Sequence, residues 1–115
     1  EDSRRVREDR GSKSVSSETT LMTDTGDLAE LTAIVERLSN RVAERLGTYE
    51  LEGKRVTLKL KTTDFDILSR SQTLDGYTAD ARVLFSVAQR LLAAEVAREP
   101  LQTYRLLGVG VAGFD

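Results

Sequence analysis

The stretch KRVTLKLKTTDFDILSRSQTL, residues Lys54–Leu74, decides the fold because its first half alternates between apolar and polar residues without a break. Val56, Leu58 and Leu60 fall on one face of an extended strand, and the basic and hydroxyl residues between them fall on the other. The second half, Ile67–Leu74, continues as a strand rich in serine and threonine. The pattern predicts a hairpin with one apolar face toward a core and one basic, hydroxyl-rich face toward the outside.

The amino-acid composition excludes several classes of function. The chain has 115 residues, which suits one domain, and it is 39% hydrophobic and 31% charged, as in globular proteins. It contains no cysteine and no histidine, which removes the usual zinc ligands, thiol nucleophiles and histidine bases. The absence of cysteine fits a reducing compartment, and no apolar run approaches the ~20 residues of a membrane span. Because the chain begins without methionine, we expect it to be a piece of a longer protein.

The formal net charge of −2 excludes a uniformly basic nucleic-acid binder, but the charge is unevenly distributed. The hairpin Lys54–Leu74 carries five basic and two acidic side chains, a net charge of +3. The segment Asp27–Leu46 carries three basic and four acidic side chains, a net charge of −1. Positive charge is therefore expected on the strands.

The chain before the hairpin predicts a linker, a strand and a helix. Residues 1–12 are polar with mixed charges and form the expected linker, although their arginines could also contact a polyanion. Lys13–Leu21 is rich in hydroxyl residues and predicts the first strand. Apolar residues recur at steps of three and four from Leu28 to Leu46 and predict a helix. We expect Gly26 or Asp27 to cap its start and Gly47 to form a left-handed cap at its end.

The chain after the hairpin predicts a second helix and a last strand. Asp75-Gly76 is expected to end the hairpin, and Thr78 to cap a helix that stops before Pro100. The apolar side of this helix is expected to contain Leu84, Val87, Ala88, Leu91 and Ala94. Thr103–Ala112 predicts the last strand, with Gly108 and Gly110 on one face. Two glycines there indicate either close approach of another surface to the backbone, or a bulge or a flat solvated face.

The expected fold is α+β, with the element order βαββαβ, a four-stranded antiparallel sheet and both helices packed on one face. The other face of the sheet stays open. The residues expected on it are Ser14, Ser16, Lys59, Lys61, Ser69, Ser71 and Thr73, with the backbone at Gly108 and Gly110. Hydroxyls, lysines and backbone amides suit phosphate oxygens, whereas the alternative is a solvated face whose lysines serve solubility. This face has no aromatic residues to stack bases and no Asn or Gln cluster to read base edges.

Four segments, taken in order, resemble the little finger of Y-family translesion DNA polymerases of the DNA polymerase IV type. They are KSVSSETT from Lys13, RVTLKLKTTDF from Arg55, SRSQTL from Ser69 and RLLGVGVA from Arg105. The resemblance covers Ser12–Phe114, and the residues before it resemble the tether from the thumb domain of that family. It implies two parts for this chain, a linker at residues 1–12 and a little finger at residues 13–115.

The resemblance implies a domain that grips duplex template-primer DNA while other domains polymerise. The predicted DNA-binding residues combine the contacts that the resemblance implies with the basic strand and the two glycines. They are Lys13, Ser14, Ser16, Lys59, Lys61, Ser69, Arg70, Ser71, Thr73, Arg105, Gly108 and Gly110. It implies no catalysis and no cofactor in this domain, since the magnesium ions and catalytic carboxylates belong to the palm of the parent polymerase. It also implies a cytoplasmic protein with no membrane contact, a monomeric isolated domain, and the sliding clamp as a partner of the parent.

The sequence departs from the family pattern at three places. Ser12 and Gln72 stand where many relatives carry basic residues, so we expect modest DNA affinity. No segment up to Asp115 resembles the clamp-binding peptide. Two other functions are open: a protein–protein module that uses the same open face and, ranked last, a free-standing enzyme, for which no catalytic cluster stands out. Salt dependence would separate DNA binding from an apolar protein interface.

Overall fold

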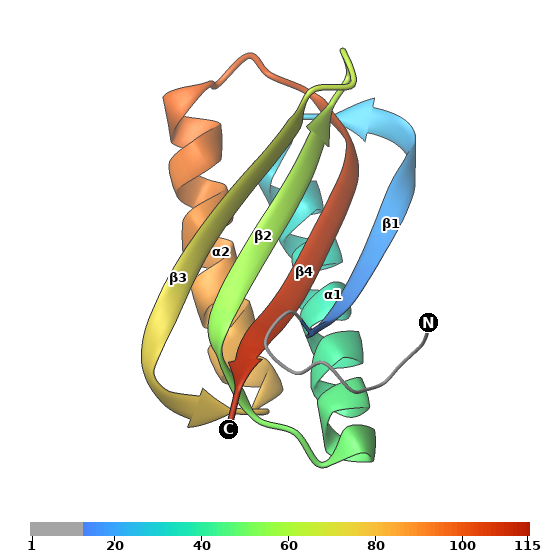
Figure 1. The fold of residues 1–115 in the computed structure, drawn as a ribbon. Helices are drawn as coiled ribbons and strands as arrows, with labels where there is room; N and C mark the ends of the chain where they lie inside the picture. Colours follow the sequence, from blue (N-terminus) through green and yellow to red (C-terminus); the bar gives the residue numbers. More distant parts are fainter. Residues whose placement is uncertain (1–12) are drawn as a thin grey trace.

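Within residues 13–115, four strands and two helices follow one another in the order βαββαβ. The computed structural model describes residues 13–115, and the predicted linker at residues 1–12 lies outside them. The elements are β1 (Ser14–Thr25), α1 (Leu28–Tyr49), β2 (Gly53–Thr62), β3 (Ile67–Thr78), α2 (Ala81–Arg98) and β4 (Tyr104–Phe114). Figure 1 shows them in chain colours. The predicted α+β class and element order are confirmed.

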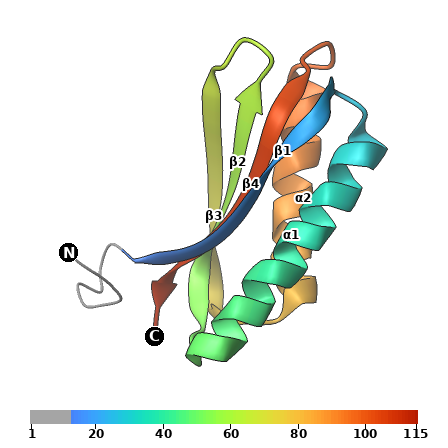
Figure 2. The same ribbon diagram turned by 90° about the vertical axis from the view of Figure 1, so that its right-hand side faces the viewer.

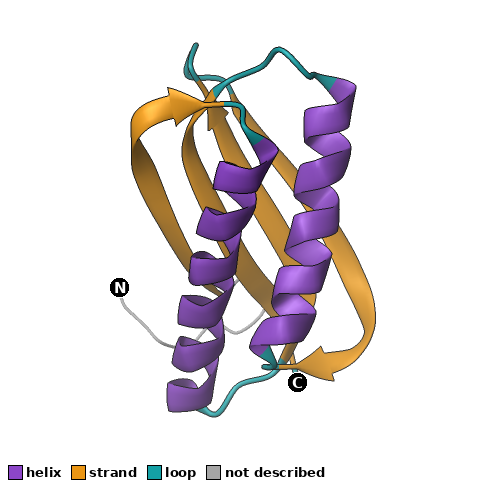
Figure 3. Cartoon of the chain, turned by 180° about the vertical axis from the view of Figure 1, so that it is seen from behind, coloured by secondary structure: helices purple, strands orange, loops and turns teal. Residues whose placement is uncertain are grey.

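The strands form one antiparallel sheet in the order β1-β4-β2-β3. Seen from the edge in Figure 2, the protein has two layers, with the sheet on one side and both helices on the other. Figure 3 shows the two helices lying side by side across the rear of the sheet. No helix among residues 13–115 covers the opposite face, and we call it the open face. Both the single covered face and the open face match the prediction.

The core lies between the helices and the covered face of the sheet. The central strands contribute the fully buried Leu58 of β2 and Val109 of β4, among others. α1 buries the expected stripe from Leu31 to Leu46, although Leu28 at its start is exposed. Within residues 13–115 neither helix is both long and apolar enough to cross a membrane.

The buried side of α2 agrees with the prediction at Leu84, Val87 and Ala88 but lies one position later in the second half of the helix. Its buried residues are Leu84, Val87, Ala88, Leu92 and Glu95, whereas Leu91 is half-buried and Ala94 is exposed. The hydrophobic pattern was misleading because an acidic residue, Glu95, takes a core-facing position. The carboxylate can be buried there because two arginines bind it, as described below.

The helix caps show which sequence signals decided the boundaries. Asp27 caps α1 as expected, and its side chain accepts from Glu30 N. The predicted cap at Gly47 is wrong, because the helix continues to Tyr49 and Glu50 takes the left-handed conformation at φ 56°. Glu50 N donates to Gly47 O at 3.1 Å and closes the last turn.

The boundary between β3 and α2 also lies later than predicted. β3 continues through Asp75-Gly76 to Thr78, so these two residues do not end the strand. Asp80, rather than Thr78, caps α2 by accepting from Arg82 N. Thr78 instead accepts from Asp80 N through its hydroxyl at 3.0 Å, which orients the cap residue.

Candidate nucleic-acid interface

The open face is a grid of four cross-strand rows set by the register of the sheet. In the strand order β1, β4, β2, β3, the rows are Ser14, Ala112, Arg55 and Thr73; then Ser16, Gly110, Thr57 and Ser71; then Glu18, Gly108, Lys59 and Ser69; then Thr20, Leu106, Lys61 and Ile67. The grid brings together the seven side chains that the sequence predicted for this face. Lys13 directly precedes β1 and is half-buried. Whether these residues bind DNA stays a prediction.

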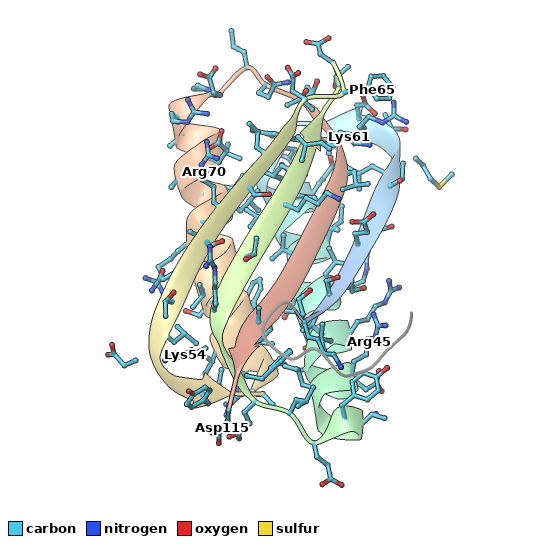
Figure 4. All side chains as sticks on the ribbon, viewed as in Figure 1. Arg45, Lys54, Lys61, Phe65, Arg70 and Asp115 are labelled. Atoms are coloured by element: carbon cyan, nitrogen blue, oxygen red, sulfur yellow. The ribbon has the colours of Figure 1, made fainter. Side chains whose placement is uncertain are left out.

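Most hydroxyl groups of the grid lie on the edge strands β1 and β3, and Thr57 lies on the central strand β2. Thr57 Oγ1 and Ser71 Oγ are hydrogen-bonded to each other at 2.9 Å, and Ser14, Ser16, Ser69 and Thr73 are exposed. The edge strand β1 is attached to the helix layer by Arg45 of α1, labelled in Figure 4, whose Nη1 donates to Ser16 O at 2.5 Å. This hydrogen bond fixes the backbone of β1 at Ser16 against the helix layer.

The net positive charge of the grid is smaller than the basic residues of β2 alone would give. Arg55, Lys59 and Lys61 share the face, but Glu18 lies among them. Lys59 Nζ and Glu18 Oε1 are 3.2 Å apart, and the two side chains are 39% and 53% exposed. Three cations and one anion leave the rows with a net charge of +2. Glu18 and Arg55 were absent from the predicted site, although strand alternation places both on this face.

Gly108 lies between the two members of this ion pair. Its row holds Glu18 on one side and Lys59 on the other, so their side chains meet across the glycine. Gly108 is buried, and a Cβ atom there would lie 3.2 Å from the Cβ of Glu18. The glycine leaves room for the ion pair, which corrects the expectation that its backbone is bare.

The predicted phosphate contacts to the amides of Gly108 and Gly110 are also wrong. Both glycines lie in β4, which is a central strand paired with β1 on one side and β2 on the other. The N–H groups of a central strand are used in the sheet ladders, so they have no free hydrogen for a ligand. Gly110 lies between Ser16 and Thr57 in its row. A side chain at this position would crowd Ser16, because a Cβ there would lie 3.3 Å from the Cβ of Ser16.

Arg70 lies on the opposite side of the sheet from the other predicted contacts. Strand alternation turns Arg70 toward the helices, on the side of α2 (Figure 4). Ser69 and Ser71 are exposed and face out. Arg70 Nη2 lies 3.3 Å from Oε1 of Glu95, whose side chain is 2% exposed. We therefore remove Arg70 from the candidate interface, because it joins β3 to α2.

Glu95 is held by a second arginine from its own helix. Arg98 Nη2 donates to Glu95 Oε2 at 2.5 Å. Hydrogen bonding from Arg98, together with the positive charge of Arg70, holds the pKa of the Glu95 carboxyl below its ordinary value of 4.5, although burial opposes this shift. The cluster has a structural role as a buried link between β3 and α2.

Arg105 lies outside the regular grid, at the end of the sheet near the β2–β3 hairpin loop. Thr62 is opposite Tyr104, but Lys61 is opposite Leu106, so Arg105 is an extra residue in β4. Its guanidinium carbon lies 4.2 Å from the centre of the Phe65 ring. Phe65 was not predicted as a site residue, and only its place in the loop beside a basic strand could have suggested it.

The fold and this hydroxyl-rich, moderately basic face define a domain class that the sequence comparison identifies. Residues 12–115 match the model of the impB/mucB/samB family C-terminal domain, and the chain belongs to that family. The chain is 41% identical to DNA polymerase IV 1 of Mesorhizobium japonicum over 97% of its own length and 25% of the relative. It is 38% identical to DNA polymerase IV of Brucella melitensis, over 97% of its own length and 24% of the relative. It spans about a quarter of these curated relatives.

Solved structures agree with this assignment. A Y-family DNA polymerase chimera matches 95% of this chain and 29% of its own, with a TM-score of 0.79 and 21% identity, which shows the shared fold. The little finger domain in a complex of the beta-clamp processivity factor and the little finger domain of PolIV matches 90% of each chain, with a TM-score of 0.72 and 25% identity. The resemblance to the Y-family little finger is therefore confirmed.

Proposed function

We propose that this chain is the DNA-gripping little finger of a translesion polymerase of the DNA polymerase IV type. The observation that carries the proposal is the open face, where serine and threonine hydroxyls lie among Arg55, Lys59 and Lys61 and no helix of the described part of the chain covers them. Hydroxyls and cations of this kind bind the phosphate and sugar backbone and hold a duplex in register without reading its sequence. Sequence-independent binding suits a domain that must hold DNA with altered bases.

The charge of the face supports a moderate rather than a tight grip. Each lysine or arginine that replaces counterions on the duplex adds to affinity at low salt. Glu18 lowers this affinity, because its negative charge is paired with Lys59. A polymerase domain that holds a duplex and lets it advance benefits from contacts that break easily. The proposed role is therefore to position the template-primer during lesion bypass.

The remaining activities belong to the parent protein in this proposal. The relatives are named DNA polymerase IV, and this chain spans about a quarter of them. We propose that the parent performs nucleotidyl transfer in a palm domain, where Mg²⁺ supplies charge stabilisation, and that this domain itself needs no cofactor. The sliding clamp is a proposed partner, supported by the likeness to a little finger that forms a complex with its beta-clamp.

The experiment that tests the proposal is the salt dependence of duplex binding by the whole chain. Fluorescence anisotropy with two unrelated duplexes should give similar affinities that fall steeply as salt rises. Lys61→Ala should reduce the slope of log K against log salt by about 0.9, the value for one phosphate contact.

Lys54→Ala is the matched control for this experiment. Lys54 lies on the same strand, but its ammonium lies over the Tyr77 ring at 5.2 Å, away from the grid rows. The control should leave the slope unchanged although the charge change is the same. Duplex binding that is weak and insensitive to salt would contradict the proposal and favour the protein–protein module.

A further inference from the structure

Phe65 holds a backbone conformation that a bulky residue seldom adopts. Its φ is 71°, in the left-handed region where a side chain is strained. Hydrogen bonds fix the loop around it, since Phe65 N donates to Thr62 O at 2.9 Å and Asp66 N donates to Thr62 Oγ1 at 3.1 Å. The loop is also joined to the segment before β4, where Thr63 N donates to Thr103 O at 3.1 Å.

Burial does not explain why a phenylalanine stands at this position. The side chain of Phe65 is 61% exposed, so it adds little to the core. Its defined contact is with Arg105, whose guanidinium carbon is 4.2 Å from the ring centre. Arg105 is the extra residue in β4. A strained loop and an irregular strand therefore bring the two side chains together.

Stacking leaves Arg105 able to bind an anion. A guanidinium on an aromatic ring is held by its flat face, and its N–H donors point outward in the plane. Lys59 and Arg70 are different, because each is already paired with a carboxylate. Within residues 13–115, Arg105 and Lys61 form no ion pair with a carboxylate, and Figure 4 shows Lys61 and Phe65 at the same end of the sheet.

We infer that Phe65 is a positioning residue, which holds the guanidinium of Arg105 at the hairpin end of the open face for binding a DNA phosphate beside Lys61. This inference rests on the proposed function and adds to it the residue that prepares one phosphate contact. A flexible arginine loses freedom when it binds a phosphate, and stacking restricts that freedom before binding. The strained φ of Phe65 is then the structural cost of presenting the ring under Arg105.

The test uses Phe65→Gly, because glycine accepts the positive φ without strain and removes the side chain that contacts Arg105. The thermal midpoint of this variant should equal or exceed that of the wild type, whereas its duplex affinity at low salt should fall about three- to tenfold. Phe65→Trp keeps an aromatic face and should retain affinity within about twofold. Leu101→Gly is the matched control, since it removes another exposed apolar side chain, 96% exposed, from a nearby loop.

The double variant Phe65→Gly with Arg105→Ala separates positioning from other roles of the ring. In the Arg105→Ala background, removing Phe65 should have no further effect on affinity or on its salt dependence. A folded Phe65→Gly protein with wild-type affinity overturns the inference, and so does an Arg105→Ala protein with wild-type affinity while Lys61→Ala still weakens binding. Wild-type protein without salt-dependent duplex binding overturns the proposed function as well, so the two failures are distinguishable.

Discussion

Replacing Glu18 by glutamine should strengthen the binding of duplex DNA. Glu18 is the anion of the open face, and its Oε1 lies 3.2 Å from Lys59 Nζ. A phosphate that approaches Lys59 must compete with this carboxylate for the ammonium and is also repelled by it. Glu18→Gln keeps the size and hydrogen-bonding capacity of the side chain while removing its charge.

The magnitude follows from the geometry of the pair. A phosphate bound to Lys59 would lie about 6 Å from the Glu18 carboxylate, where repulsion between unit charges in water is about 0.7 kcal/mol. Both side chains are substantially exposed, so the pair itself is worth only about 0–1 kcal/mol, and losing it frees Lys59 at little cost to stability. The combined effect is about 1 kcal/mol, which corresponds to about fivefold tighter binding at low salt.

Fluorescence anisotropy of a labelled duplex at several salt concentrations measures this effect. The matched control is Glu36→Gln, which makes the same change in net charge at an exposed position on α1, in the helix layer. Glu18→Gln should bind more tightly than the control, with a salt slope steeper by up to about 0.9. Equal affinities for the two variants would refute the reasoning, because total charge alone would then explain the gain.

Two further predictions concern stability. Leu58→Ala removes a fully buried side chain and should lower the free energy of unfolding by about 2–5 kcal/mol, measured with urea, whereas exposed Ser69→Ala should change it by less than about 0.5 kcal/mol; similar values for both would contradict the assigned faces. Glu95→Gln removes a carboxylate whose pKa is lowered in the folded state, so the stability that Glu95 contributes is present above pH 4.5 and is lost as the pH falls through the lowered pKa. Thermal midpoints of wild type and Glu95→Gln should converge with acidification, and a constant gap would show that the charge of Glu95 is unimportant.

Alternation along the strands was enough to predict the faces of the sheet. Leu58 and Leu60 are buried and Lys59 and Lys61 face out, as their spacing requires. The same rule places Arg70 and Gln72 on the covered face, between outward-facing serines and threonine. The family resemblance had implied a DNA contact at Arg70, and the loss of a basic residue at Gln72 had been expected to weaken the grip. At both positions, strand alternation predicts the side of the sheet better than the family resemblance does.

The arrangement across strands could not be predicted from one strand at a time. The meeting of Glu18 with Lys59 depends on the strand order and the register, which place β4 between β1 and β2. The central position of β4 also removes the amides of Gly108 from the interface. Likewise, Glu95 breaks the hydrophobic pattern of α2 because its charge is paired by Arg70, which is distant in the sequence. Register and long-range pairing are properties of the folded chain.

The open face is the central claim, and NMR mapping of a DNA titration tests it most directly. Backbone amide shifts of ¹⁵N-labelled protein should change on adding duplex DNA at residues of the grid rows, among them Ser14, Ser16, Lys61, Ser69 and Ser71. Exposed residues on the outer sides of the helices, such as Glu36 and Arg90, should keep their shifts. Changes confined to α1 and α2, with the grid rows unaffected, would contradict the account.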